Sequence, residues 1–318
     1  MPQHSLDFEK PIDLLREKID ALRHMRDDAG INIADEIRRL EDRCHELMRH
    51  TFKHLSAWQI TQLARHPMRP HASDYIKAMF TDFDELHGDR AFKDDRAILA
   101  GLARLDGKPV MVVGQEKGRE TKGRIAHNFG MPHPEGYRRA LRLFKLAERY
   151  QIPVITIIDT PGAYPSIDAE ARGQSEAIAR NLLEMAQLRT PIICAVIGEG
   201  CSGGALGIGV GDHTMMMQYA YYATISPEGC ASILWKSSSK AQEAAATMGI
   251  TAEVLLQRGL IDSIVEEPLG GAHRDPQLAA SFLKTALLTQ LRPLKQKTPD
   301  QLVADRYQRL VKIGRERE

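Results

Sequence analysis

The sequence has no surplus of charge of either sign. Its 43 lysines and arginines nearly balance its 42 aspartates and glutamates, which gives a net charge of +1. Without a basic surplus there is no electrostatic case for binding nucleic acid or a membrane surface. No stretch approaches the roughly 20 apolar residues of a membrane-spanning helix, and residues 1–10 lack the apolar core of a signal peptide. We therefore expect a cytoplasmic protein that binds neither nucleic acid nor membrane.

Cysteine is scarce, and neither cysteine nor histidine is spaced for metal binding. The four cysteines, Cys44, Cys194, Cys201 and Cys230, include no C-x-x-C pair, and the 12 histidines include no H-E-x-x-H motif. Scattered cysteines of this kind fit a reducing compartment. We expect no zinc site and no other metal on this chain.

Glycine, by contrast, is concentrated in one segment. Residues 192–197 form a β-rich apolar run, and the glycine-dense residues 198–211 follow directly. This pattern predicts a strand, a turn and then a helix of small residues. Glycine lets another molecule approach the bare backbone, and the start of a helix offers unpaired N–H groups to an anion.

Two motifs with side-chain chemistry overlap in this segment. Residues 198–203 match the G-x-G-x-x-G dinucleotide fingerprint, but no carboxylate occurs in residues 215–222, where the motif requires one. Residues 200–204 match the G-x-S-x-G nucleophile elbow, with Ser202 as nucleophile. A hydrolase would then need an acid and a histidine later in the chain, and the candidates are Asp212 or Asp262 with His273.

A third interpretation uses the backbone alone. The amides at Gly203 and Gly204 could form an oxyanion hole. Close packing of a helix on a sheet also explains small residues, and the local sequence by itself favours this packing explanation.

The upstream sequence favours a functional role for the glycine segment over the packing explanation. Residues 153–159 predict a buried strand that ends at the turn-forming residues 160–164, and residues 170–188 predict a crossover helix that leads to the strand at 192. Because parallel strands end at one edge of a sheet, the turns at 161–163 and 203–205 are expected to face a common pocket.

Longer strings make a specific resemblance visible. Residues 159–165 (Asp-Thr-Pro-Gly-Ala-Tyr-Pro), 198–206, 225–236 and 259–265 resemble the alpha subunits of the bacterial acetyl-coenzyme A carboxylase carboxyltransferase, members of the crotonase-like superfamily. The likeness extends to residues 57–67, 117–122 and 267–274, so it covers nearly the whole chain. Cys201 departs from the glycine expected in many relatives, but it leaves the Gly203-Gly204 pair intact.

The resemblance implies an α/β fold of the crotonase-like, spiral ββα type with an N-terminal helical extension. It also implies transfer of a carboxyl group from carboxybiotin to acetyl-coenzyme A, which gives malonyl-coenzyme A for fatty acid synthesis. Both reacting halves develop an oxyanion that needs preorganised amide donors, and the loss of one donor costs about 3 kcal/mol in other enzymes. The resemblance assigns catalytic amides to Gly203, Gly204 and Ala205, and carboxybiotin binding to Gly162 and Ala163.

The resemblance also implies partners. Biotin is the expected cofactor, attached to a biotin carboxyl carrier protein and not to this chain. A carboxyltransferase beta subunit is expected to supply the coenzyme A half of a shared site, in an α2β2 assembly, with biotin carboxylase as a further component. The beta subunit often carries a zinc ribbon, so the absence of zinc-ligand spacing here favours the alpha assignment. No side-chain general base is assigned, because the freed ureido nitrogen of biotin can take the proton.

Two further motifs have a structural and a functional interpretation. The basic run 117–124 is either a solvated loop or an anion clamp that uses Lys117 and Arg119. The run 226–229 predicts a helix start with a serine cap and a proline in the first turn. If this start borders the pocket, Glu228 and Gly229 bind carboxybiotin.

The chain divides into three predicted regions: a helical hairpin in 1–70, the crotonase-like domain in 71–275 and a polar helical tail in 276–318. Apolar residues spaced by three and four predict the hairpin, with its break at 27–30. The clearest strands are predicted at 98–105, 109–113, 154–158, 192–197 and 261–265, and helices at 136–149, 171–188 and 240–248. Asp106-Gly107 predicts a hairpin turn between the first two strands. The alternatives to a carboxyltransferase are a serine hydrolase that uses Ser202 and a non-catalytic scaffold for a biotin carrier protein.

Overall fold

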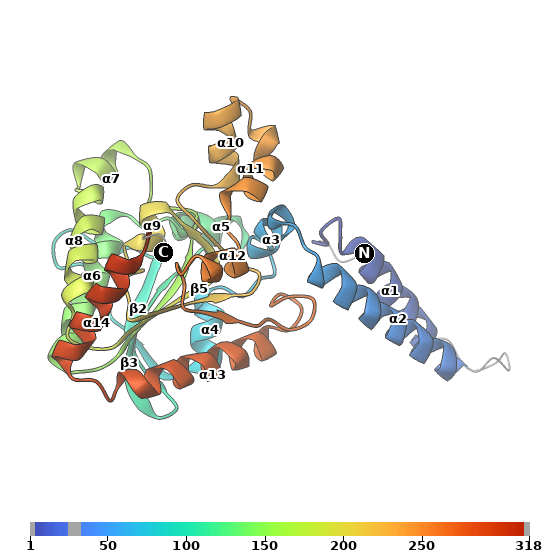
Figure 1. Cartoon of the computed structure of the whole chain (residues 1–318), viewed down its shortest axis with the longest axis horizontal. Coiled ribbons are helices and arrows are strands. Elements are labelled where there is room, and N and C mark those ends of the chain that lie inside the picture. The colour runs from blue at the N-terminus through green and yellow to red at the C-terminus, as the bar shows by residue number, and fades with distance from the viewer. Residues whose placement is uncertain (1–3, 25–32, 315–318) are drawn as a thin grey trace.

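The computed structural model describes residues 4–24 and 33–314 of the chain. Its centre is an eight-stranded sheet in the order β1-β2-β3-β4-β5-β6-β8, with β7 paired to the end of β5 (Figure 1). From β3 to β8 neighbouring strands are parallel, whereas β1 and β2 are antiparallel to their neighbours. The strands are β1 Thr81–Glu85, β2 Ile98–Leu105, β3 Lys108–Gln115, β4 Val154–Thr160, β5 Ile192–Cys201, β6 His213–Met217, β7 Tyr221–Ala223 and β8 Ser263–Val265.

The central strands form because they are continuous apolar runs. Every residue of β4 and β5 is buried, as expected for parallel strands that are covered on both faces. The predicted hairpin between β2 and β3 is confirmed: Leu105 pairs with Lys108, and Asp106 and Gly107 both have positive φ angles, at 51° and 73°. Two positive φ angles are what a type I′ turn requires.

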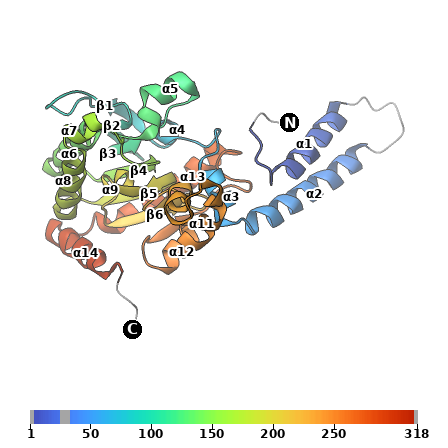
Figure 2. The same ribbon diagram turned by 90° about the horizontal axis from the view of Figure 1, so that it is seen from above.

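Helices cover both faces of this sheet (Figure 2). Helices α6 and α8 pack on one side, and α4 and α13 pack on the other. Asn181 and Met185 of α8 and Leu283 and Leu287 of α13 are fully buried. None of the described helices is long and apolar enough to cross a membrane. The α-helices are α1 Lys10–His24, α2 Ile33–Lys53, α3 Ala57–Ala64, α4 Ala72–Met79, α5 Glu120–Ala126, α6 Pro134–Arg149, α7 Ile167–Ala171, α8 Gln174–Gln187, α9 Ser202–Leu206, α10 Pro227–Trp235, α11 Ala241–Met248, α12 Ala252–Gln257, α13 Pro276–Leu294 and α14 Pro299–Lys312.

The amino-terminal hairpin of α1 and α2 projects from this body (Figure 1). Its seam buries Ile12 and Ile19 of α1 against Leu40, Cys44 and Met48 of α2. The predicted hairpin is therefore confirmed, while its predicted break at 27–30 lies outside the described residues.

The carboxyl-terminal segment is helical as predicted, but the prediction that it is polar was wrong. Leu283, Leu287 and Leu291 of α13 and Leu302 of α14 belong to the main hydrophobic core. Two of the three prolines in this segment, Pro276 and Pro299, stand in the first turn of their helices, a position that needs no backbone N–H. The region boundaries at 70/71 and 275/276 stay predictions.

Candidate functional site

The candidate site lies at the edge of the sheet where β3, β4 and β5 end. Strand β4 ends at Thr160 and leads into the turn 161–163, while β5 ends at Cys201 and leads into α9. Both turns follow parallel neighbours, so they meet at one edge. The prediction that the two turns lie together is confirmed.

The two turns are in direct contact at Gly204. A β-carbon built on Gly204 would lie 2.3 Å from the carbonyl carbon of Gly162 and 2.5 Å from the nitrogen of Ala163. Gly204 thus leaves no room for a side chain, and neighbouring Gly203 has ample room, since its β-carbon would meet only Ile178 at 3.6 Å. Gly162 itself has a φ angle of +151°, which side chains disfavour.

The first turn of α9 leaves the amides of Gly203 and Gly204 without helical acceptors. Ala205 lies one residue further on, where the helical hydrogen-bond pattern begins, so its amide is the least available of the three. The carbonyl oxygen of Gly204 accepts hydrogen bonds from Gln115 Nε2 at 2.7 Å and from the Tyr137 hydroxyl at 3.1 Å. Both donors are buried, and they fix the orientation of the peptide that links Gly204 to Ala205 and carries the Ala205 amide.

Ser202 has the backbone but not the partners of a hydrolase nucleophile. It is the exposed first residue of α9, directly after β5, and has a φ angle of +56°, as a strand-to-helix elbow requires. The histidine proposed for it, His273, lies beside Glu9, while Asp212 binds Arg306 and Asp262 binds Arg309. The structure therefore gives no support to the serine hydrolase alternative.

Sequence reasoning missed a buried charge network beneath the two turns. Lys117 Nζ lies 2.6 Å from Asp159 Oδ1 and 2.7 Å from Glu199 Oε1. Arg65 Nε donates to the other oxygen of Glu199 at 2.7 Å, and the Tyr221 hydroxyl donates to it at 2.6 Å. Burial alone would raise the pKa of Glu199, but Lys117 and Arg65 lower it to about 2. One sequence signal could have indicated this network. Lys117 follows β3, and Asp159 and Glu199 lie near the ends of β4 and β5, so three charged residues occur at the ends of neighbouring strands.

Helix α10 is tied to this network. Its start is as predicted, because the Ser226 hydroxyl caps the helix by accepting from the Gly229 amide and Pro227 occupies the first turn. Glu228 pairs with Arg65 at 2.6 Å. The structure thus brings Glu228 to the charge network, with Gly229 beside it in the chain, and contact of either residue with biotin stays a prediction.

The two cations predicted as an anion clamp already have partners. Lys117 is held by two carboxylates, and Arg119 pairs with Asp74 and donates to the carbonyl oxygen of Pro67 at 3.1 Å. An anion-binding role for either would require these pairs to open.

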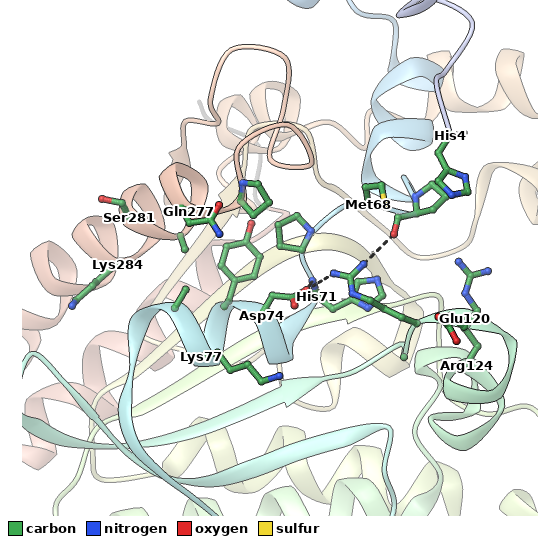
Figure 3. Close-up of a pocket in the computed structure, with 18 of the residues that line it drawn as sticks. His4, Met68, His71, Asp74, Lys77, Glu120, Arg124, Gln277, Ser281 and Lys284 are labelled. Carbon is green, nitrogen blue, oxygen red and sulfur yellow. Dashed lines mark hydrogen bonds and ion pairs between the residues drawn. The ribbon is translucent and has the colours of Figure 1, made fainter. Parts of the chain in front are cut away.

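A hollow of about 1210 Å³ lies beside the site, between α4, α5 and the start of α13 (Figure 3). His4 and Arg124 line one side, and Ser281 and Lys284 line the other. The hollow shares Arg124 with a smaller cavity of about 200 Å³ that is lined by Lys117, Asp159 and Glu199. The turns 161–163 and 202–204 line neither of these spaces, so the geometry of the turns, and not the size of a hollow, locates the candidate site.

One group of potential metal ligands lies apart from the site. Single atoms of Glu9, His66 and His273 lie within 4.8 Å of one another. Both nitrogens of His66 take part in hydrogen bonds, and Arg274 binds Glu9 at 2.6 Å. Arg274 thus already provides a positive charge next to Glu9. The cluster connects Glu9, directly before α1, to the segment that precedes α13.

The sequence is closely similar to known proteins of one family. Residues 5–314 match the family model described as acetyl co-enzyme A carboxylase carboxyltransferase-like. The chain is 62% identical to the acetyl-coenzyme A carboxylase carboxyl transferase subunit alpha of Methylococcus capsulatus, over 97% of this chain and 96% of that protein. It is 61% identical to the same subunit of Hydrogenovibrio crunogenus, over 97% of each chain.

Solved structures confirm the fold class. The transcarboxylase 12S structure has a TM-score of 0.55 at 19% identity, covering 68% of this chain and 41% of the other. A Pseudomonas malonate decarboxylase hetero-tetramer gives a TM-score of 0.55 at 17% identity, covering 66% and 84%. The predicted crotonase-like α/β architecture is thus confirmed. With its near full-length match to the family model and to these relatives, the chain belongs to the acetyl-coenzyme A carboxylase carboxyltransferase alpha subunits.

Proposed function

We propose that this chain provides the carboxybiotin half of a split carboxyltransferase site. The carrying observation is the contact between Gly204 and the Gly162–Ala163 peptide, which joins two amide-bearing turns at one edge of the sheet. A carboxyl transfer develops negative charge on an oxygen, and preorganised backbone amides stabilise such charge without moving.

The open space at the turns fits the expected group. A β-carbon at Gly162 would meet nothing within 4 Å, and one at Gly203 would meet only the end of Ile178. A planar ureido ring can therefore approach bare backbone here. Carboxybiotin on a carrier protein supplies the carboxyl group when it is bound.

The residues of this chain then act as follows. Gly203 and Gly204 donate amide hydrogen bonds to the oxygen that gains charge, with Ala205 behind them. Gly162 and Ala163 form the opposing wall, and Glu228 and Gly229 close the side towards α10. Gly207 donates to the Gly203 carbonyl oxygen at 2.9 Å and so holds the peptide that carries the Gly204 amide. Gln115 and Tyr137 hold the next peptide, which carries the Ala205 amide, so these two donors need little reorganisation during the reaction.

A beta subunit that binds acetyl-coenzyme A completes the site in this proposal, most simply as an α2β2 assembly, and biotin carboxylase recharges the carrier. The purified chain alone is therefore expected to form no malonyl-coenzyme A from carboxybiotin and acetyl-coenzyme A, and activity is expected when the beta subunit is added. Robust turnover by the lone chain would contradict the split site. Assembly without turnover would favour a scaffold.

A further inference from the structure

The pairing of β4 with β5 becomes irregular just before the two turns. The strands run in register from Val154–Ile192 to Ile158–Val196, but the next pair is Thr160–Gly200. Two steps along β4 therefore correspond to four steps along β5. Extra residues of this kind disrupt the hydrogen-bond ladder and bend the strand. The ladder by itself does not set the spacing between the turns.

Side chains replace the ladder at this point. The carboxylate of Asp159, in the irregular part of β4, accepts a hydrogen bond from the backbone amide of Glu199 at 2.9 Å. Gly198 permits this approach, because a β-carbon there would lie 2.5 Å from Asp159 Oδ1. Lys117, two residues beyond β3, binds both carboxylates. Its side chain is 14% exposed, and those of Asp159 and Glu199 are 3% and 9% exposed.

Lys117 compensates the negative charges of two buried carboxylates, those of Asp159 and Glu199. Two buried carboxylates held close together disfavour joint ionisation unless a cation lies between them. Arg65 binds only the far oxygen of Glu199 and extends to Glu228. Among the residues that the structure describes, Lys117 alone has a cationic atom within ion-pair distance of both Asp159 and Glu199.

We propose that Lys117 is a positioning residue, an inference that rests on the proposed function. Lys117 bridges Asp159 and Glu199 and thereby sets the spacing between the turns 161–163 and 202–204. Lys117 does not touch substrate in this account. It acts through the ends of the two strands that carry the amide donors.

The test uses the complex reconstituted from this chain and a beta subunit. Lys117→Met is expected to lower kcat roughly 10- to 100-fold, because small displacements of positioned groups cost that much, while KM for acetyl-coenzyme A stays within about twofold. Lys117→Arg should retain more activity than Lys117→Met. Lys122→Met removes an exposed cation from the same run and is the matched control.

Hydrogen exchange of the folded variants provides a readout besides activity. Amides in 160–164 and 200–206 should exchange faster in Lys117→Met than in the wild type. If Lys117→Met does not fold, Glu199→Gln, which keeps the shape but weakens the bridge, should show the same kcat loss and exchange pattern.

Two results would overturn the proposal: a folded Lys117→Met with unchanged kcat and exchange, or a large rise in KM with unchanged kcat, which would indicate substrate binding. If instead the wild-type complex made no malonyl-coenzyme A, the proposed function would fail, and exchange at the turns would still decide the role of Lys117.

Discussion

Gly204 lies so close to Ala163 that a β-carbon built on Gly204 would be 2.5 Å from the Ala163 nitrogen. The contact joins the turn after β4 to the start of α9, although 41 positions separate the two residues (204 − 163). Glycine is needed here because the neighbouring atoms are backbone and cannot move aside like a flexible side chain.

Ser202 offers a test of backbone against side-chain chemistry. Ser202→Ala keeps a β-carbon and the φ angle of the wild type, and it removes the hydroxyl that a hydrolase needs. We expect carboxyl transfer by the reconstituted complex to stay within about twofold of wild type, because the amides carry the charge stabilisation. A loss of several hundredfold in kcat would show that the Ser202 side chain takes part in the reaction.

Acid should release the amino-terminal hairpin from the body. Burial alone would raise the pKa of Glu9, but His273 and Arg274 lower it from 4.5 to about 2. A lowered carboxylate pKa adds stability above pH 4.5, and this stability is lost as pH falls towards 2. Burial, followed by repulsion from His273, lowers the pKa of His66 from 6.5 to about 4, which costs stability over that range. Both effects weaken docking in acid.

Hydrogen exchange of residues 10–24 and 33–53 between pH 6.5 and pH 3 would measure this release. Glu9→Gln should loosen the hairpin already at neutral pH, whereas Glu46→Gln on the exposed face of α2 should not. Amide protection factors, which are corrected for the intrinsic pH dependence of exchange, that stay constant with pH in the wild type would contradict the assignment.

Arg306 should be a large contributor to stability. It is 1% exposed, pairs with Asp212 at 2.8 Å and donates to the carbonyl oxygens of Met185 and Leu188. Arg306→Met leaves Asp212 without its cation, and loss of one partner of a buried pair costs about 3–5 kcal/mol. Urea unfolding would measure the change.

The control for Arg306 is Arg309→Met, which removes a more exposed pair with Asp262 and should cost about 1 kcal/mol or less. Equal losses in the two variants would mean that α14 does not depend on the buried pair.

The sequence predicted the parts of the fold that depend on local pattern. The runs that form β4 and β5 were visible because continuous apolar residues are required of strands covered on both faces. The turns after them were visible because glycine and proline mark such positions. Strands β1, β6 and β7 were missed. Thr81–Glu85 is polar and Tyr221–Ala223 is short, and only their pairing makes them strands. His213–Met217 is short and rich in methionine, which is a good helix former.

The candidate site was predicted only in part, for a similar reason. Gly203 and Gly204 carry a local signal, and the resemblance implies the catalytic role proposed for them. The bridge from Lys117 to Asp159 and Glu199 joins three separate strand ends, and nothing in the basic run 117–124 indicates that its first lysine turns inward. The same limit applies to α13, whose leucines reach the core through the packing of α13 and not through a local motif.

The most direct measurement compares Gly204→Ala with Gly203→Ala in the reconstituted complex, with assembly checked by sedimentation. The added methyl group at Gly204 meets backbone at 2.3 Å, and at Gly203 it meets only a side-chain end at 3.6 Å. We predict that Gly204→Ala assembles but loses about 100-fold or more in turnover, equivalent to about 3 kcal/mol of transition-state stabilisation, while Gly203→Ala stays within about tenfold of wild type. An assembled Gly204→Ala complex with near wild-type turnover would show that this turn is only packing, and would contradict the backbone-amide site.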